Sequence, residues 1–388
     1  MLHKFFRKTP IAWLQVKREK TRLAVAVAGI AFADLLIFFQ LGLMESVYKS
    51  ATGIHSRLRG DLYLVNSLSD NMQTIKPFSR ARLSQARRVD GVADISSLYV
   101  GYGEWLNLDN RRISRVQVYG FNPDKPAINL PEVNLQLNKL KLLNYVLQDR
   151  SARPGLGDVM GKLQQSQFFS AQVNRFQTKV CGLFTMGIPF FADGNLIVSD
   201  STFLQLFPDR LPNQIDVGII VLKQGTVIEK AQINLKAQLP NDVLVLTKEE
   251  FIQQERDYWE RVNPIGLVFG FGTFVGFLVG TVIVYQILYS DVSDHLPEYA
   301  TLKAIGYSDL YFVGVLFQEA LLLGCIGFIF GFITTLGLYA LIYQATLLPV
   351  FMSLNRAILV LALTLVMCTL SGALAIQKLQ YADPADIF

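Results

Sequence analysis

Cysteine and histidine are scarce in this chain of 388 residues, which holds three of each. The six residues are spread along its length: Cys181, Cys325, Cys368, His3, His55 and His295. No HExxH motif and no closely spaced cysteine pair occurs, so we expect no metal site, no cofactor and no catalytic residues in this chain. With so few cysteines, any large domain is expected to fold on its own core rather than on disulfides.

A nucleotide-binding motif is also missing, because no GxxxxGK[ST] run occurs anywhere. The glycines from Gly270 onward loosely resemble a phosphate-binding loop, but they lie inside an apolar run that no strand precedes. The series Gly272, Gly276 and Gly280 has instead the spacing that lets two membrane helices approach closely. We therefore predict helix packing at these glycines, within the chain or against a second copy.

Charge is low and unevenly placed. Only 17% of the residues are charged, 51% are hydrophobic, and the mean hydropathy is +0.33. The net charge of +5 is concentrated at the N-terminus and forms no nucleic-acid-like patch, so we expect no nucleic-acid partner. The hydrophobic residues gather in four long runs, and about 20 apolar residues suffice to cross a bilayer. We predict transmembrane helices at residues 23–44, 265–289, 310–343 and 357–376.

The charges before the first run predict the orientation. Residues 1–22 carry seven basic residues and one acidic residue, which favours a cytoplasmic N-terminus. Residues 290–309 and 377–388 would then also be cytoplasmic, whereas residues 45–264 and the short loop 344–356 would lie outside. Part of residues 1–22 is predicted to form an amphipathic helix on the inner membrane surface. A merely basic flank is the alternative.

The segment 45–264 has the composition of a folded domain. Short runs of Val, Ile, Tyr and Phe, bounded by turn residues, alternate with helical stretches, which predicts an α+β domain. Residues 130–177 are richer in Asn, Gln and Leu and are interpreted as an inserted second lobe. Residues 45–57 and 248–262 are predicted to be stalk helices that continue the neighbouring spans.

Three polar residues lie inside or at the edge of the predicted spans: Asp34, Gln40 and Glu319. A carboxylate such as Asp34 is costly in a bilayer and usually faces protein or a water-filled path. A helix–helix contact, a proton or substrate site, and a protonated, packed Asp34 all remain open. Gln40 is interpreted as a helix contact, and Glu319 as lying near the inner membrane boundary.

The inner loop holds a predicted short helix from Asp294 to Ile305. Pro297 suits its first turn and Gly306 suits its end. A short helix on the inner face is suited to docking into the groove of a partner protein. The alternative is a plain surface loop.

The run EYATLKAIG in this loop, from Glu298 to Gly306, resembles the FtsX/MacB/LolC-type permease family of ABC transporters. Gln318 and Glu319 with the glycine-rich third run, and the ending DPADIF, resemble the same family. The run FADLLIFFQLG, which contains Asp34 and Gln40, is similar to DevC-like cyanobacterial permeases of heterocyst glycolipid export.

The resemblance implies a membrane subunit with a MacB-like periplasmic domain between its first two helices. It implies a homodimer in the bacterial inner membrane bound to two copies of a separate ABC ATPase, which holds ATP and Mg. A periplasmic membrane-fusion adaptor, and indirectly a TolC-like outer-membrane channel, would complete a tripartite exporter of a glycolipid or another lipid-like amphiphile. ATPase motion would reach the periplasmic domain by mechanotransmission.

The same resemblance assigns ATPase coupling to a set of residues in the inner loop: His295, Glu298, Tyr299, Leu302, Lys303, Ile305 and Gly306. One alternative is an FtsX-like, ATPase-coupled regulator of a cell-wall enzyme outside the membrane. Another is a membrane-anchored enzyme that works through its outer domain. The kinds of partner that co-purify with the chain, or turnover by the outer domain, distinguish these functions.

Overall fold

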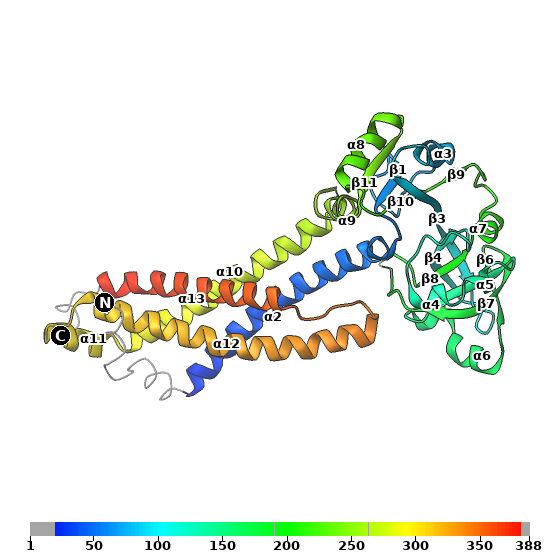
Figure 1. Cartoon of the computed structure of the whole chain (residues 1–388). Coiled ribbons are helices and arrows are strands. Elements are labelled where there is room, and N and C mark those ends of the chain that lie inside the picture. The colour runs from blue at the N-terminus through cyan, green and yellow to red at the C-terminus, as the bar shows by residue number, and fades with distance from the viewer. Residues whose placement is uncertain (1–19, 190, 263, 382–388) are drawn as a thin grey trace. The chain divides into compact units, whose positions relative to one another are not determined.

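The computed structural model describes residues 20–189, 191–262 and 264–381, and it gives two compact units (Figure 1). The amphipathic segment predicted before Lys20 lies outside the described residues, as does the DPADIF ending. The first unit holds residues 1–45, 265–344 and 350–388, and the second holds residues 46–264 and 345–349.

The first unit contains four long helices and one short one. The long helices are α2 (Lys20–Thr52), α10 (Ile265–Asp294), α12 (Asp309–Thr346) and α13 (Leu354–Tyr381), and the short helix is α11 (Leu296–Ala304). All four long helices are long and apolar enough to cross a membrane. The predicted four-helix membrane protein with a large domain between its first two spans is therefore confirmed. Helix α2 extends to Thr52, eight residues beyond the predicted end of the first span at residue 44.

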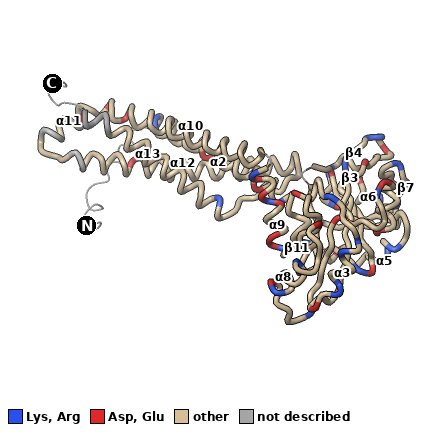
Figure 2. The backbone as a smooth tube through the Cα atoms, turned by 90° about the horizontal axis from the view of Figure 1, so that it is seen from above, with Lys and Arg blue, Asp and Glu red and all other residues tan. Residues whose placement is uncertain are grey.

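Glycines bring the long helices close together. A Cβ on Gly276 would meet Ile37 at 3.1 Å, and a Cβ on Gly280 would meet Ala33 at 2.7 Å. These contacts place the glycine series of α10 against α2, so larger side chains there would force the two helices apart. Charged residues are sparse along the long helices in comparison with the second unit (Figure 2).

The second unit, here called the ectodomain, is built on a nine-stranded mixed sheet. Its order is β11-β1-β10-β3-β4-β8-β5-β7-β6, with parallel pairs β4–β8 and β5–β7. The strands are β1 (Leu62–Asn66), β3 (Val92–Leu106), β4 (Ile113–Phe121), β5 (Tyr145–Asp149), β6 (Phe169–Val173), β7 (Phe176–Phe184), β8 (Gly194–Ser199), β10 (Val217–Leu222) and β11 (Val243–Thr247). Strands β2 (Phe78–Ser79) and β9 (Gln214–Ile215) form a separate pair.

Helices cover both faces of this sheet, so strand residues are buried on either side. In β1, Leu62 and Leu64 belong to one core, whereas Tyr63 and Val65 belong to the other, as the two-residue period of a strand requires. Helices α3 (Ala81–Ala86), α7 (Asp200–Leu206) and α8 (Ile228–Gln238) contribute to the first core. Helices α4 (Pro131–Asn134), α5 (Leu137–Leu140) and α9 (Lys248–Asp257) contribute to the second.

Residues 130–177, predicted to be an inserted second lobe, contribute strands to the main sheet. Strands β5 and β6 of this segment are members of the nine-stranded sheet, and α6 (Val159–Gln165) lies between them in the chain. The ectodomain forms one compact unit. The segment is poor in β-branched residues, but strand pairing and burial decide sheet membership more strongly than composition does.

The predicted helix 248–262 is a helix followed by a wider turn. A capping box between Thr247 and Glu250 starts α9, and a π-helical turn, Tyr258–Val262, follows it. The buried Glu255 accepts hydrogen bonds from the Trp259 indole at 2.9 Å and from the Met72 backbone amide at 2.7 Å. Its carboxylate also lies 3.6 Å from Nε2 of the buried His55, which belongs to the 3₁₀ turn His55–Arg57. These contacts join the beginning and the end of the ectodomain's chain.

Candidate coupling site

Helix α11 lies between the second and third long helices in the chain. Pro297 stands in its first turn, where a missing N–H costs nothing. Gly306 follows its end with a φ of +104°, a conformation that favours glycine. The residues around this helix are arranged by two kinds of contact, apolar packing on one side and ion pairs at its start.

The predicted coupling residues divide between a packed side and an exposed side of α11. Leu296 and Leu302 pack against a buried cluster of Val292, Phe312, Leu316 and Ile376. Glu298 of α11 and Ile305, the first residue after this helix, are exposed, with Ile305 retaining 71% of its accessible surface. The side chains of Tyr299 and Lys303 lie outside the described part of the chain. Leu302 therefore packs inside this protein, and Ile305 is the apolar side chain offered to solvent.

A cluster of charges joins the start of α11 to two long helices. Arg22 of α2 donates from Nη1 to Oδ1 of Asp291 at 2.9 Å and also pairs with Asp294. His295 Nε2 lies 3.8 Å from Asp291 Oδ1, and His295 Nδ1 lies 3.3 Å from Glu298 Oε2. Sequence analysis named His295 and Glu298 but missed Arg22, Asp291 and Asp294. The sequence did contain a signal for this cluster. Arg22 ends the basic segment before the first span, and the acidic residues Asp291 and Asp294 follow the second span on the same predicted side of the membrane.

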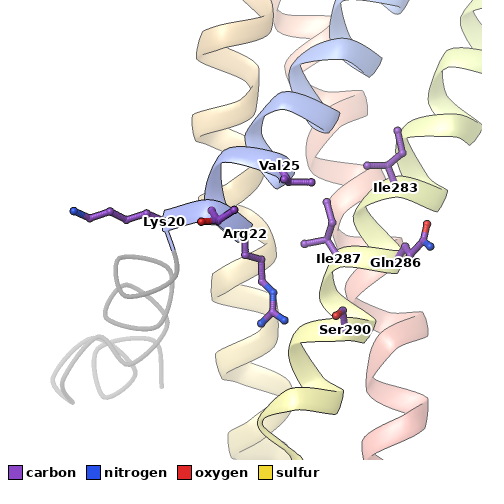
Figure 3. A pocket seen from close by; sticks show the side chains of 8 residues that line it. Lys20, Arg22, Val25, Ile283, Gln286, Ile287 and Ser290 are labelled. Carbon is purple, nitrogen blue, oxygen red and sulfur yellow. The ribbon is translucent and has the colours of Figure 1, made fainter.

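A groove lies between α2 and α10 beside this cluster (Figure 3). Its volume is about 840 Å³. Val25 of α2 and Ile283 and Ile287 of α10 extend toward it, and Ser290 lies at its polar end (Figure 3). The two helices are thus separated at this end, although small residues bring them together farther along.

Asp34 is fully buried in the four-helix unit. Its Oδ1 accepts a hydrogen bond from Thr364 of α13 at 2.6 Å, and Gly331 of α12 packs against its Cβ. Its Oδ2 has no hydrogen-bond partner among the residues that the structure describes. The Thr364 hydroxyl also lies 2.8 Å from the carbonyl of Val360, one turn earlier. This arrangement is a polar contact between helices.

The remaining polar and glycine residues lie at helix contacts. A Cβ on Gly272 would meet the Gln40 side chain at 2.5 Å, so the glycine makes room for the amide. Glu319 of α12 is buried, with 4% of its surface exposed.

A second ion-pair cluster, absent from the sequence predictions, ties three helices at the opposite end of α2. Arg356 of α13 pairs with Glu45 of α2 and donates to the Tyr339 hydroxyl of α12 at 3.0 Å. Tyr339 in turn donates to the carbonyl of Phe38. Arg356 is 5% exposed. Opposite charges at the ends of the first and last apolar runs were the signal available in the sequence.

Comparison with known families identifies the C-terminal part of the chain. Residues 270–384 match the family of the FtsX-like permease C-terminal domain. This stretch runs from α10 through α11 and α12 to the end of α13. The chain is therefore a multi-pass membrane protein with an FtsX-like permease domain, and the predicted coupling segment lies inside that domain.

Two solved structures are similar to part of the chain. One is the periplasmic region of MacB from Actinobacillus actinomycetemcomitans, with a TM-score of 0.37, 12% identity, and coverage of 54% of this chain and 98% of that chain. The other is the extracellular domain of the noncanonic ABC-type transporter YknZ from Gram-positive bacteria, with a TM-score of 0.34, 13% identity, and coverage of 48% and 100%. No curated protein matches the chain. The assignment of the permease domain comes from the family match.

Proposed function

We propose that this chain is the non-catalytic membrane subunit of an ABC-type exporter, driven by an ATPase that is a separate chain. The observation that carries the proposal is the FtsX-like permease match, which encloses α11. The basic excess in residues 1–22 favours a cytoplasmic N-terminus, and four spans then return the C-terminus to the same side. With this orientation α11 faces the cytoplasm, where ATP is available.

In this proposal the exposed side of α11 docks into a groove of the ATPase. Ile305 supplies apolar surface and Glu298 supplies charge, while Leu296 and Leu302 fix the helix to the long helices. Movement of α11 would pass to α2 and α10, which are joined through the chain to the two ends of the ectodomain. Such mechanotransmission moves the ectodomain without requiring cargo to pass between the helices.

The proposed cargo is a glycolipid or another lipid-like amphiphile. Its support is the resemblance of the run FADLLIFFQLG to DevC-like permeases. By the same resemblance we propose a homodimer in the inner membrane, with two ATPase copies, a periplasmic membrane-fusion adaptor and, through it, a TolC-like channel. The ectodomain would contact the adaptor.

The test is affinity purification of the tagged full chain in mild detergent, followed by identification of every co-purifying protein. An ABC ATPase together with a periplasmic adaptor supports the exporter. If an ATPase and a cell-wall hydrolase co-purify instead, the chain regulates that hydrolase and the export function is rejected. Recovery of the intact chain with no ATPase rejects the proposal.

A further inference from the structure

The inner charge cluster connects the first turn of one long helix to the last turn of another. Arg22 lies two residues after the start of α2, and its partners Asp291 and Asp294 lie in the last turn of α10. Helix α11 begins directly after these carboxylates. We propose that Arg22 is a positioning residue that fixes the coupling helix α11 relative to α2. The role of this contact in coupling rests on the proposed function, whereas the ion pairs themselves are observed in the structure.

The contact continues from α2 into α11 through neighbouring side chains. Asp291 lies between Arg22, at 2.9 Å, and His295, at 3.8 Å, and His295 reaches Glu298 of α11 at 3.3 Å. The Asp291 side chain is only 5% exposed. Arg22 itself is 24% exposed, so its pair with Asp291 is partly shielded from water and is screened by salt less than a fully exposed pair. The planar guanidinium of Arg22 also engages two carboxylates at once, which a lysine ammonium does less well.

A groove lies beside the charge cluster, between the same two helices. Helices α2 and α10 touch where a Cβ on Gly29 would meet Ile283 at 2.5 Å. Closer to the helix ends, the groove of about 840 Å³ separates Val25 from Ile287 (Figure 3). Leu23 of α2 and Ile287 of α10 still pack against one apolar cluster beside the groove, and the ion pairs of Arg22 add a polar connection at the helix ends. A displacement of α11 therefore reaches α2 at Arg22.

The experiment measures the distance between α2 and α11 in the full chain. Spin labels are attached to Val25→Cys and Thr301→Cys, both exposed positions, after Cys181, Cys325 and Cys368 have been replaced by serine. Pulsed electron paramagnetic resonance then gives the distance distribution in detergent or nanodiscs. Arg22→Gln is expected to shift and broaden the distribution. The charge-swapped pair Arg22→Asp with Asp291→Arg is expected to restore it, and Arg22→Lys to restore it in part.

The matched control is Lys20→Gln, which removes the same charge from the same groove. Within the described part of the chain, Lys20 forms no ion pair. An unchanged distribution in Arg22→Gln overturns the proposal, and so does equal broadening in Lys20→Gln. If Arg22→Gln does not accumulate in the membrane, the charge-swapped pair decides: a parental distribution supports the contact, and a broadened one overturns it.

A second readout separates this inference from the proposed function. In the complex with the co-purified ATPase, Arg22→Gln is expected to retain the ATPase but to lower the stimulation of its activity by glycolipid-containing vesicles by about tenfold, within the usual range of coupling between sites. If no ATPase co-purifies with the parent chain, the proposed function fails, and the distance measurement still decides the role of Arg22. If Arg22→Gln alters the distance between the spin labels but leaves the stimulation of ATPase activity unchanged, Arg22 makes a structural contact and has no role in coupling.

Discussion

At the residue scale, burial sets the proton affinity of the two groups that join the ends of the ectodomain's chain. Burial raises the pKa of Glu255 from 4.5 to about 7, against the opposing effect of the hydrogen bonds from Trp259 and Met72. Burial lowers the pKa of His55 from 6.5 to about 3. Both groups are therefore favoured in their neutral forms near pH 6, and the 3.6 Å contact between them is not held by opposite charges there.

The raised pKa of Glu255 makes the ectodomain lose stability as the pH rises. The contribution of Glu255 is complete below about pH 4.5, where the carboxyl is protonated in folded and unfolded chains alike, and it is lost between pH 4.5 and 7. The full loss is about 3 kcal/mol. We expect Glu255→Gln to remove this slope, measured by urea unfolding followed by tryptophan fluorescence at several pH values. Glu249→Gln, on the exposed side of α9, is the control and should keep the slope.

His55 acts in the opposite direction, because its lowered pKa costs stability as the pH falls from 6.5 toward 3. The two effects oppose each other between pH 4.5 and 6.5, so each variant must be compared with the parent at the same pH. Equal pH slopes in the parent and in Glu255→Gln would contradict the assignment.

Asp34 is expected to tolerate removal of its charge. Asp34→Asn preserves the size of the side chain and an oxygen that accepts from Thr364, and Thr364 also retains the carbonyl of Val360. Hydrogen bonds between membrane helices are worth about 1 kcal/mol, so the loss of thermal stability in detergent should be small. Wild-type folding with abolished export would show instead that Asp34 takes part in transport.

At the element scale, α11 has one side that holds it in place and one side that is free for a partner. Ile305→Asp is expected to leave the yield of membrane-integrated protein unchanged, because Ile305 is exposed, and to weaken ATPase co-purification about tenfold or more. Leu302→Asp is expected to lower the yield itself, since Leu302 packs against the buried cluster around Phe312. The comparison is made by quantitative recovery of both proteins. ATPase binding by Ile305→Asp equal to that of the parent chain would contradict the docking role.

The long helices and the loop helix were predictable because their signals are local. Apolar runs of spanning length are typical of membrane helices, and Pro297 with Gly306 brackets α11 in the sequence itself. The ion pair of Arg22 with Asp291 was missed, because the two residues lie 269 positions apart: the charge signs suggested an attraction, but only the packing of α2 on α10 fixes which residues meet. The same reason explains the missed pair of Glu45 with Arg356. The position of β5 and β6 in the main sheet also depends on distant strands rather than on their own composition.

At the scale of the whole molecule, the ectodomain has two buried cores of its own, one on each face of its sheet. Its one cysteine, Cys181, is buried and free, and burial raises the pKa of its thiol to about 11. We expect its unfolding temperature to be the same with and without a reducing agent, and the Cys181 thiol to react with alkylating reagents only after unfolding. A fall in unfolding temperature on reduction would indicate a disulfide with another chain.

The strand order has a consequence for how the protein is made. Among the described residues, strand β1 pairs only with β10 and β11, so Leu62 has no neighbour in the sheet until Ile220, and later Thr247, has been synthesised. Pairings between such distant segments form slowly, and unpaired strands are prone to aggregate in the meantime. Synthesis of the ectodomain is nearly complete when Thr247 emerges, and α10 follows from Ile265. The first span is thus made long before the sheet can close, and a chaperone on the ectodomain's side would find β1 exposed throughout that interval.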